Sequence, residues 1–322
     1  MELHPTPENP LPPGARCLAV LTRDRQLLRA MLACPQNACG TVVIIGGRGD
    51  FIERYFETMR EFMARGLAVA AVDLRGQGGS ERKGKNPYRG YLRSFSGFDE
   101  DIRAFMEEVV LPECPGPHYG LGHSTGGHVL LRALRTNSWF RKVVLVSPLV
   151  DVIYGAWPRP VAAALVNTVN LLGLGGMFLP SVSKTPLGRK DFPGNLLTSD
   201  LRRWNRDSAT LETAPHLGLG GATFSWLGAA RRSLASVAAM RRRPQAPVLI
   251  IAAENDRVVS NAATRRLARL VPGVALAFVP ESRHEILSER DMIRQQFLAA
   301  FDSFINTDQD AAPNSPPAQR PG

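Results

Sequence analysis

Short, continuous apolar runs alternate along the chain with longer stretches that favour helices. The apolar runs are bounded mainly by glycine, proline or charged residues, as buried strands are, and lie at 40–47, 67–73, 117–121, 142–148, 247–253 and 274–279. Residues 51–65 carry apolar side chains at helical spacing, and further helices are expected at 98–110, 260–270 and 289–305. This rhythm predicts an α/β protein with an open, mostly parallel central sheet and helices on both faces.

The two ends of the chain depart from this rhythm. Residues 1–15 are rich in proline and are expected to form a flexible arm. A hairpin is expected next, with 17–21 pairing with 27–33. Residues 306–322 are polar and rich in proline, which predicts a disordered tail.

The rhythm also stops between residues 149 and 243, which contain helix-like stretches but no convincing strand. This predicts a mainly helical cap inserted into a core formed by 16–148 and 244–305. Within the cap, 161–180 is largely apolar and as long as a membrane span. Its glycines and polar residues favour a buried or substrate-facing cap helix over a transmembrane helix, with a face touching the membrane interface as the intermediate alternative.

The net charge of +10 suits an anionic partner, either nucleic acid or a membrane surface. No basic stripe interleaved with aromatic residues and no helix-turn-helix pattern is present, so nucleic acid is not expected. The densest basic cluster, 231–232 with 241–243, flanks a helix-like segment. A solvated face is the favoured interpretation, and contact with phospholipid head groups is the alternative.

The chain starts without the basic and apolar segments of a secretory signal, so a cytoplasmic protein is expected, with peripheral contact with the inner face of the membrane as an alternative. Its four cysteines, Cys17, Cys34, Cys39 and Cys114, lack metal-binding spacing, and no metal is expected. Cys34 and Cys39 are close enough in sequence to pair. Free thiols are nevertheless the favoured expectation in a reducing compartment.

The pentapeptide Gly122–Gly126 has the pattern G-x-S-x-G and lies between a predicted strand and an apolar helix. Its glycines allow a cramped strand-to-helix turn that presents Ser124 in a strained conformation above the sheet. The sequence therefore predicts Ser124 as a nucleophile.

A serine nucleophile needs a base, and the base needs a group that fixes its tautomer. Asp256 follows the predicted strand 247–253 and His284 follows 274–279, so both should emerge with Ser124 at the carboxyl edge of the sheet. Glu254 is the competing candidate for the acid.

The other histidines are expected to have lesser roles. His118 lies on the strand before Ser124 and is expected to be structural, whereas His123 should pack below the nucleophile. His128 lies on the following helix. His216 falls in the predicted cap and is a candidate for lining the substrate pocket, whose other residues within 149–243 stay open.

Acyl transfer also needs backbone N–H groups that bind the developing oxyanion. The amide of Thr125, directly after the nucleophile, is one candidate. The amide of Arg48 is the second, because the glycines at 46, 47 and 49 let that loop turn an N–H inward. A glycine-rich turn without a catalytic amide is the alternative, and the spacing of a dinucleotide-binding loop is absent.

Taken together, these motifs resemble the monoglyceride lipase and bacterial lysophospholipase branch of the α/β-hydrolase superfamily, which is grouped with serine aminopeptidase-like hydrolases. The resemblance rests on the segments 47–55, 73–80 (D-x-R-G-x-G-x-S), 122–127, 254–259 and 282–287. One departure is Gly46-Gly47, where monoglyceride lipases usually carry His-Gly.

The resemblance implies an α/β-hydrolase fold and a cofactor-free serine esterase that acts through an acyl-enzyme. Ser124, Asp256 and His284 would form the triad, with Arg48 and Thr125 as oxyanion donors. The implied substrate is a lysophospholipid or a monoacylglycerol. A short-chain esterase, a lactonase and an aminopeptidase-like amidase are alternatives on the same residues. A non-catalytic protein that binds anionic lipid or nucleic acid is the alternative from another class, and the oligomeric state stays open.

Overall fold

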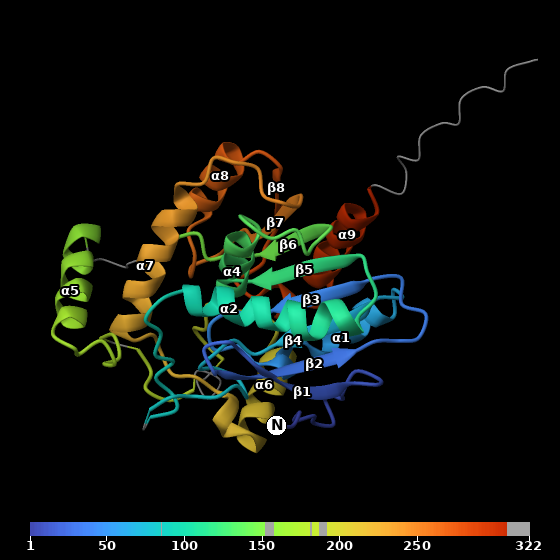
Figure 1. The fold of residues 1–322 in the computed structure, drawn as a ribbon, viewed down its shortest axis with the longest axis horizontal. Helices are drawn as coiled ribbons and strands as arrows, with labels where there is room; N and C mark the ends of the chain where they lie inside the picture. The colour runs from blue at the N-terminus through green and yellow to red at the C-terminus, as the bar shows by residue number, and fades with distance from the viewer. Residues whose placement is uncertain (85, 152–157, 181, 187–191, 308–322) are drawn as a thin grey trace, which may run out of the picture.

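The computed structural model describes residues 1–84, 86–151, 158–180, 182–186 and 192–307. Its centre is a single sheet with the strand order β1-β2-β4-β3-β5-β6-β7-β8 (Figure 1). The strands are β1 Arg16–Leu21, β2 Leu27–Ala33, β3 Thr41–Ile45, β4 Ala68–Val72, β5 His118–His123, β6 Lys142–Val146, β7 Val248–Ala253 and β8 Val274–Val279. In this sheet, β2 pairs antiparallel with β1 and with β4, and the other neighbouring strands pair parallel. The predicted hairpin and the open, mostly parallel sheet are thus confirmed.

Helices cover both faces of this sheet. They are α1 Phe56–Met63, α2 Ser96–Phe105, α3 Leu111–Glu113, α4 Thr125–Ala133, α5 Arg159–Leu171, α6 Leu201–Thr213, α7 Phe224–Ala238, α8 Asn261–Leu270 and α9 Asp291–Asn306. Side chains of α1 and α9 share one apolar cluster with the sheet, and those of α2, α4 and α8 share the other. Strands β3 and β4 are buried along their whole length between these layers, which explains their uninterrupted apolar sequences.

Between β6 and β7 the described residues form α5, α6 and α7, and α5 packs against α7 (Figure 1). We call residues 149–243 the cap. Helix α5 ends at Leu171, so the apolar segment 161–180 is not one helix. Within the described residues, no helix combines the length and the hydrophobicity that a membrane span requires.

The first fifteen residues do not form the flexible arm that was expected. The backbone amide of His4 donates to Glu53 Oε1 at 3.0 Å, and Asn9 Nδ2 donates to the Glu53 carbonyl at 2.8 Å. Arg29 Nη1 donates to the Glu2 carbonyl at 2.9 Å and to Glu53 Oε1 at 2.7 Å. These contacts between distant parts of the chain fix the segment, and a proline-rich composition does not reveal them. The predicted disordered tail lies outside the described residues from position 308 onward.

One further expectation needs correction. The predicted helix 98–110 begins at Ser96, has π-helical hydrogen bonding over Met106–Val110 and continues into α3 to Glu113. All four cysteines are free, as expected, but the neighbour of Cys34 is not Cys39. Its sulfur lies 3.3 Å from that of Cys114, because the end of β2 passes the segment that follows α3.

Candidate active site

Ser124 occupies the turn between β5 and α4 with φ 48° and ψ −113°, a conformation that side-chain-bearing residues rarely adopt. The flanking glycines allow this turn. A Cβ on Gly126 would lie 2.0 Å from the Ile45 carbonyl oxygen, and one on Gly122 would lie 2.7 Å from the Gly127 Cα. No side chain fits at either position, so the turn can form only with glycine there.

His284 and Asp256 meet at the carboxyl edge of the sheet, as predicted. The Nδ1 of His284 lies 2.7 Å from Asp256 Oδ2, and Asp256 Oδ1 accepts from the amides of Val258 and Val259 at 2.8 and 3.0 Å. Burial by itself disfavours the charged carboxylate, but the hydrogen bond and charge of His284, with those amides, hold the pKa of Asp256 below its usual value. Glu254, the competing acid, is exposed and accepts from the Glu281 amide instead.

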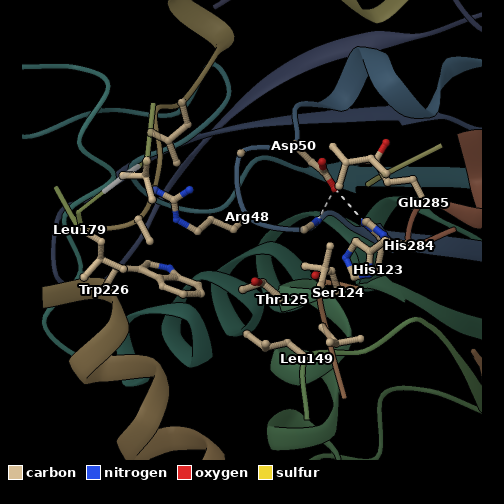
Figure 2. A pocket seen from close by; sticks show the side chains of 18 of the residues that line it. Arg48, Asp50, His123, Ser124, Thr125, Leu149, Leu179, Trp226, His284 and Glu285 are labelled. Carbon is tan, nitrogen blue, oxygen red and sulfur yellow. Dashed lines mark hydrogen bonds and ion pairs between the residues drawn. The ribbon is translucent and has the colours of Figure 1, made fainter. Parts of the chain in front are cut away.

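Ser124 and His284 line the same cavity, and their side chains lie close together in Figure 2. Among the described residues no hydrogen bond joins the serine hydroxyl to the imidazole. Such bonds are often long in ligand-free enzymes and tighten when substrate binds.

In the loop after β3, the backbone amide of Arg48 differs from those of its two neighbours. The Gly47 amide donates to Asp50 Oδ2 at 2.6 Å, and the Gly49 amide donates to Gln77 Oε1 at 3.2 Å. The Arg48 amide between them has no acceptor among the described residues. The Thr125 amide begins α4, where helix N–H groups lack intrahelical partners. Both predicted oxyanion donors are therefore available at the cavity wall beside Ser124.

Sequence reasoning did not assign a role to Asp50 or Gln77, which hold this loop. Asp50 Oδ2 accepts from the hydroxyl of Tyr55 at 2.6 Å and contacts His123 Nδ1 at 3.1 Å, in addition to the Gly47 amide. Gln77 Nε2 donates to the Gly47 carbonyl at 2.9 Å. Both residues lie inside the two motifs 47–55 and 73–80, which are the signal that could have identified them.

The surroundings of the other histidines agree with the roles expected for them, except at His216. His123 is buried, and its ring lies 5.1 Å from that of His284. His118 Nε2 contacts the Cys114 carbonyl. Burial, together with the charge of Arg132, lowers the pKa of His128 to about 3. His216 was a candidate for lining the pocket and is not among the described residues that line it. Its ring packs against His4 of the ordered N-terminal segment, with the two centroids 5.0 Å apart.

The cavity above Ser124 has a volume of about 800 Å³. Its wall is mainly apolar and is formed by both the core and the cap, with cap side chains that include Leu165, Val166, Leu179, Phe224 and Trp226. Its charged side is centred on Arg54, which forms ion pairs with Asp50, Asp207 and Glu285. Within the described residues, no group of three or more His, Cys, Asp or Glu side chains is arranged to hold a metal ion.

Comparison with known proteins gives a consistent family. Residues 36–291 match the model of the serine aminopeptidase family S33. A probable lysophospholipase L2 of Haemophilus influenzae is 26% identical over 287 residues, which cover 88% of this chain and 90% of the relative. A monoacylglycerol lipase of Mycolicibacterium smegmatis is 28% identical over 256 residues, or 78% of this chain and 82% of the relative.

The fold also matches solved structures. A soluble variant of monoglyceride lipase from Saccharomyces cerevisiae superposes with a TM-score of 0.67 at 16% identity, covering 92% of this chain and 98% of that one. The monoacylglycerol lipase of Paleococcus ferrophilus gives 0.66 at 21% identity, covering 88% and 99%. The molecule is thus an α/β-hydrolase. It belongs to the serine aminopeptidase S33 family and is an enzyme of the serine hydrolase class.

Proposed function

We propose that this protein hydrolyses carboxylic esters of single acyl chains, in lysophospholipids or monoacylglycerols, through an acyl-enzyme on Ser124. One observation carries the proposal. A serine held in a strained turn opens into a large apolar cavity that it shares with a histidine paired to a buried aspartate. This combination supplies a nucleophile, a base and an apolar environment for an acyl chain.

In the first half of the reaction, Ser124 Oγ forms a bond to the ester carbonyl carbon while its proton passes to His284 Nε2. The Asp256 carboxylate accepts the Nδ1–H of His284, which fixes the tautomer and stabilises the imidazolium. The ester C–O bond then breaks, and the proton on Nε2 passes to the leaving alcohol.

The carbonyl oxygen becomes an oxyanion in this step, and the amides of Arg48 and Thr125 bind it. The Asp50 and Gln77 side chains keep the Arg48 peptide in place by holding the amides on either side of it. Water then repeats the sequence on the acyl-enzyme, with His284 as base, and releases the fatty acid and free Ser124. Oxyanion donors of this kind each contribute about 10²- to 10³-fold to turnover.

The size and polarity of the cavity favour a long acyl group over the alternatives. Its wall of leucine, valine, phenylalanine and tryptophan side chains would stay largely uncovered by the acyl part of a short-chain ester, a lactone or a peptide. Relatives named as lysophospholipase L2 and as monoacylglycerol lipase support the same substrate class. The non-catalytic alternative gains no support, because all three candidate catalytic residues are present.

We further propose that the cap touches an anionic membrane surface. Leu171, Leu172, Leu174 and Met177 are exposed by 88%, 66%, 49% and 50% and follow one another at the end of α5. Leu165, on the same helix, lines the cavity. An exposed apolar patch at the end of a helix that also lines the cavity, on a chain of charge +10, suits a lipid surface from which an acyl chain enters.

Product analysis tests the proposed activity. The enzyme is incubated with lysophosphatidylcholine, monoacylglycerol and a short-chain ester, and the products are identified by mass spectrometry. The proposal requires free fatty acid from at least one of the two lipids, at a kcat/KM above that for the short-chain ester. Turnover of the short-chain ester alone would refute the substrate class, with heat-treated enzyme as the control for background hydrolysis.

A further inference from the structure

Two arginines line the cavity, and their surroundings differ sharply. Arg54 contacts three carboxylates, those of Asp50, Asp207 and Glu285. Arg48 contacts no carboxylate among the residues that the structure describes, although its backbone belongs to the candidate oxyanion loop. The proposed mechanism uses the Arg48 amide and leaves its side chain without a role.

The Arg48 side chain extends from this loop towards the cap, as Figure 2 shows. Its Nη2 donates to the Gly221 carbonyl at 2.7 Å, and its guanidinium carbon lies 5.3 Å from the centroid of the Trp226 ring. The Nε is buried and has no hydrogen-bond partner among the described residues. The Arg48 guanidinium carries five N–H donors, and its contacts described above are one carbonyl oxygen and one aromatic ring.

Arg48 is half-buried, and removing a cation from water without a counter-ion costs free energy. Burial lowers the pKa of Arg48 to about 10, so the side chain still carries its charge at neutral pH. A carbonyl dipole and a ring quadrupole reduce the cost but provide no negative charge. No carboxylate of the described residues neutralises this charge, so an anionic group that enters the cavity can pair with it.

The position of the charges indicates where an anionic group would bind. Near Arg54 three carboxylates outnumber the arginine and repel an anion. Arg48 offers an unpaired guanidinium in a mainly apolar environment, where a charge-assisted hydrogen bond is strong.

We propose that the Arg48 guanidinium binds the phosphate of the lipid substrate and so makes the enzyme select lysophospholipids over neutral monoacylglycerols. This inference rests on the proposed ester hydrolysis and specifies its substrate. A planar guanidinium suits a phosphate because it can donate two parallel hydrogen bonds to it.

The rival explanation is structural, because the contact with Gly221 also ties the cap to the oxyanion loop. Loss of such a tie would lower turnover of every ester by a similar factor. Loss of a phosphate-binding side chain would lower turnover of phosphate-bearing esters more than that of neutral ones. The ratio of the two kcat/KM values therefore separates the explanations, and any shared effect on the oxyanion loop cancels in it.

The experiment compares lysophosphatidylglycerol and monoacylglycerol with the same acyl chain, both below their critical micelle concentrations. We expect wild type to favour the phosphate-bearing lipid and Arg48→Met to lower the kcat/KM ratio about 10- to 100-fold, as removal of a charged hydrogen-bonding partner does. Arg48→Lys, which keeps the charge and loses the fork, should give an intermediate ratio. Arg269→Met removes an exposed arginine of α8 and should leave the ratio at its wild-type value.

An unchanged ratio in Arg48→Met, or a wild-type preference for the neutral lipid, would overturn the inference while leaving ester hydrolysis intact. Absence of turnover by wild type on both lipids would instead contradict the proposed function. If Arg48→Met is inactive on both lipids, binding of the corresponding ether lipids to Ser124→Ala, with and without Arg48→Met, replaces the rates. The inference then requires affinity for the phosphate-bearing ether lipid to fall at least tenfold more than affinity for the neutral one, and equal losses would contradict it.

Discussion

The Asp50 carboxylate connects the oxyanion loop to the histidine that precedes the nucleophile. It contacts the Gly47 amide, the Tyr55 hydroxyl and His123, and it pairs with Arg54. Burial by itself would raise the pKa of Asp50, but the positive charge of Arg54 and the contact with His123 hold it well below its usual range. An ionised Asp50 therefore keeps the loop in place across the neutral range.

The same contact predicts a pH-dependent contribution of His123 to stability. Burial by itself lowers the pKa of His123, but the hydrogen bond to Asp50 and its charge raise it above the ordinary value. The stabilisation is then fully present below the unfolded-state pKa of about 6.5 and is lost as pH rises through the raised folded-state pKa. His123→Gln should therefore cost more free energy of unfolding at pH 6 than at pH 9, as measured by urea denaturation. A cost that is equal at both pH values, or larger at pH 9, would contradict this.

At the scale of single residues, the sequence was sufficient to predict site residues that have catalytic side chains and come soon after the end of a strand. Asp256 and His284 each follow a strand, and the structure places His284 Nδ1 2.7 Å from Asp256 Oδ2. Asp50 and Gln77 act through hydrogen bonds between loops, which periodicity does not show. His216 was a candidate for the pocket, but it packs against His4 of the N-terminal segment, a contact that the composition does not reveal.

At the scale of elements, the turn between β5 and α4 depends on how closely α4 approaches β3. The Gly126 Cα faces the carbonyl oxygen at the end of β3, and an added Cβ would lie 2.0 Å from it. Gly126→Ala should therefore destabilise the protein by about 3 kcal/mol or more, at the upper end of overpacking costs, and lower the midpoint of thermal unfolding.

Gly176→Ala is the matched control for this change. An added Cβ there meets only the end of the Arg89 side chain at 3.5 Å, so a change below about 0.5 kcal/mol is expected. Equal stability of the two variants would show that the close approach of α4 to β3 does not constrain the turn.

Most strands were predictable because parallel strands covered on both faces are continuously apolar. Strand β5 extends to His123, two residues beyond its predicted end, and places Ser124 immediately after it. The π-helical turn at Met106–Val110 and the ordered N-terminal segment were not predictable. Both depend on contacts or hydrogen bonding that the local pattern of apolar residues does not encode.

At the scale of the whole molecule, positive charge and an exposed apolar patch occur together. The chain carries a net charge of +10, and the apolar side chains of Leu171, Leu172, Leu174 and Met177 are exposed on the cap. We expect the double variant Leu171→Ser/Leu172→Ser to bind anionic phospholipid vesicles at least tenfold more weakly than wild type in a sedimentation assay. Binding by wild type should also weaken as salt concentration rises.

Met292→Ser is the control, because Met292 is 79% exposed on α9, outside the cap. Its vesicle binding should equal that of wild type. Equal binding by the double variant and wild type would contradict a membrane-facing cap.

The central claim is that Ser124 is the nucleophile, and labelling with a fluorophosphonate tests it most directly. Wild type should be labelled at Ser124, as located by peptide mass spectrometry, and Ser208→Ala, which alters another serine of the same cavity, should be labelled equally well. Ser124→Ala should lose both the label and the turnover of p-nitrophenyl acyl esters. Labelling of Ser124→Ala at the wild-type level would contradict the account.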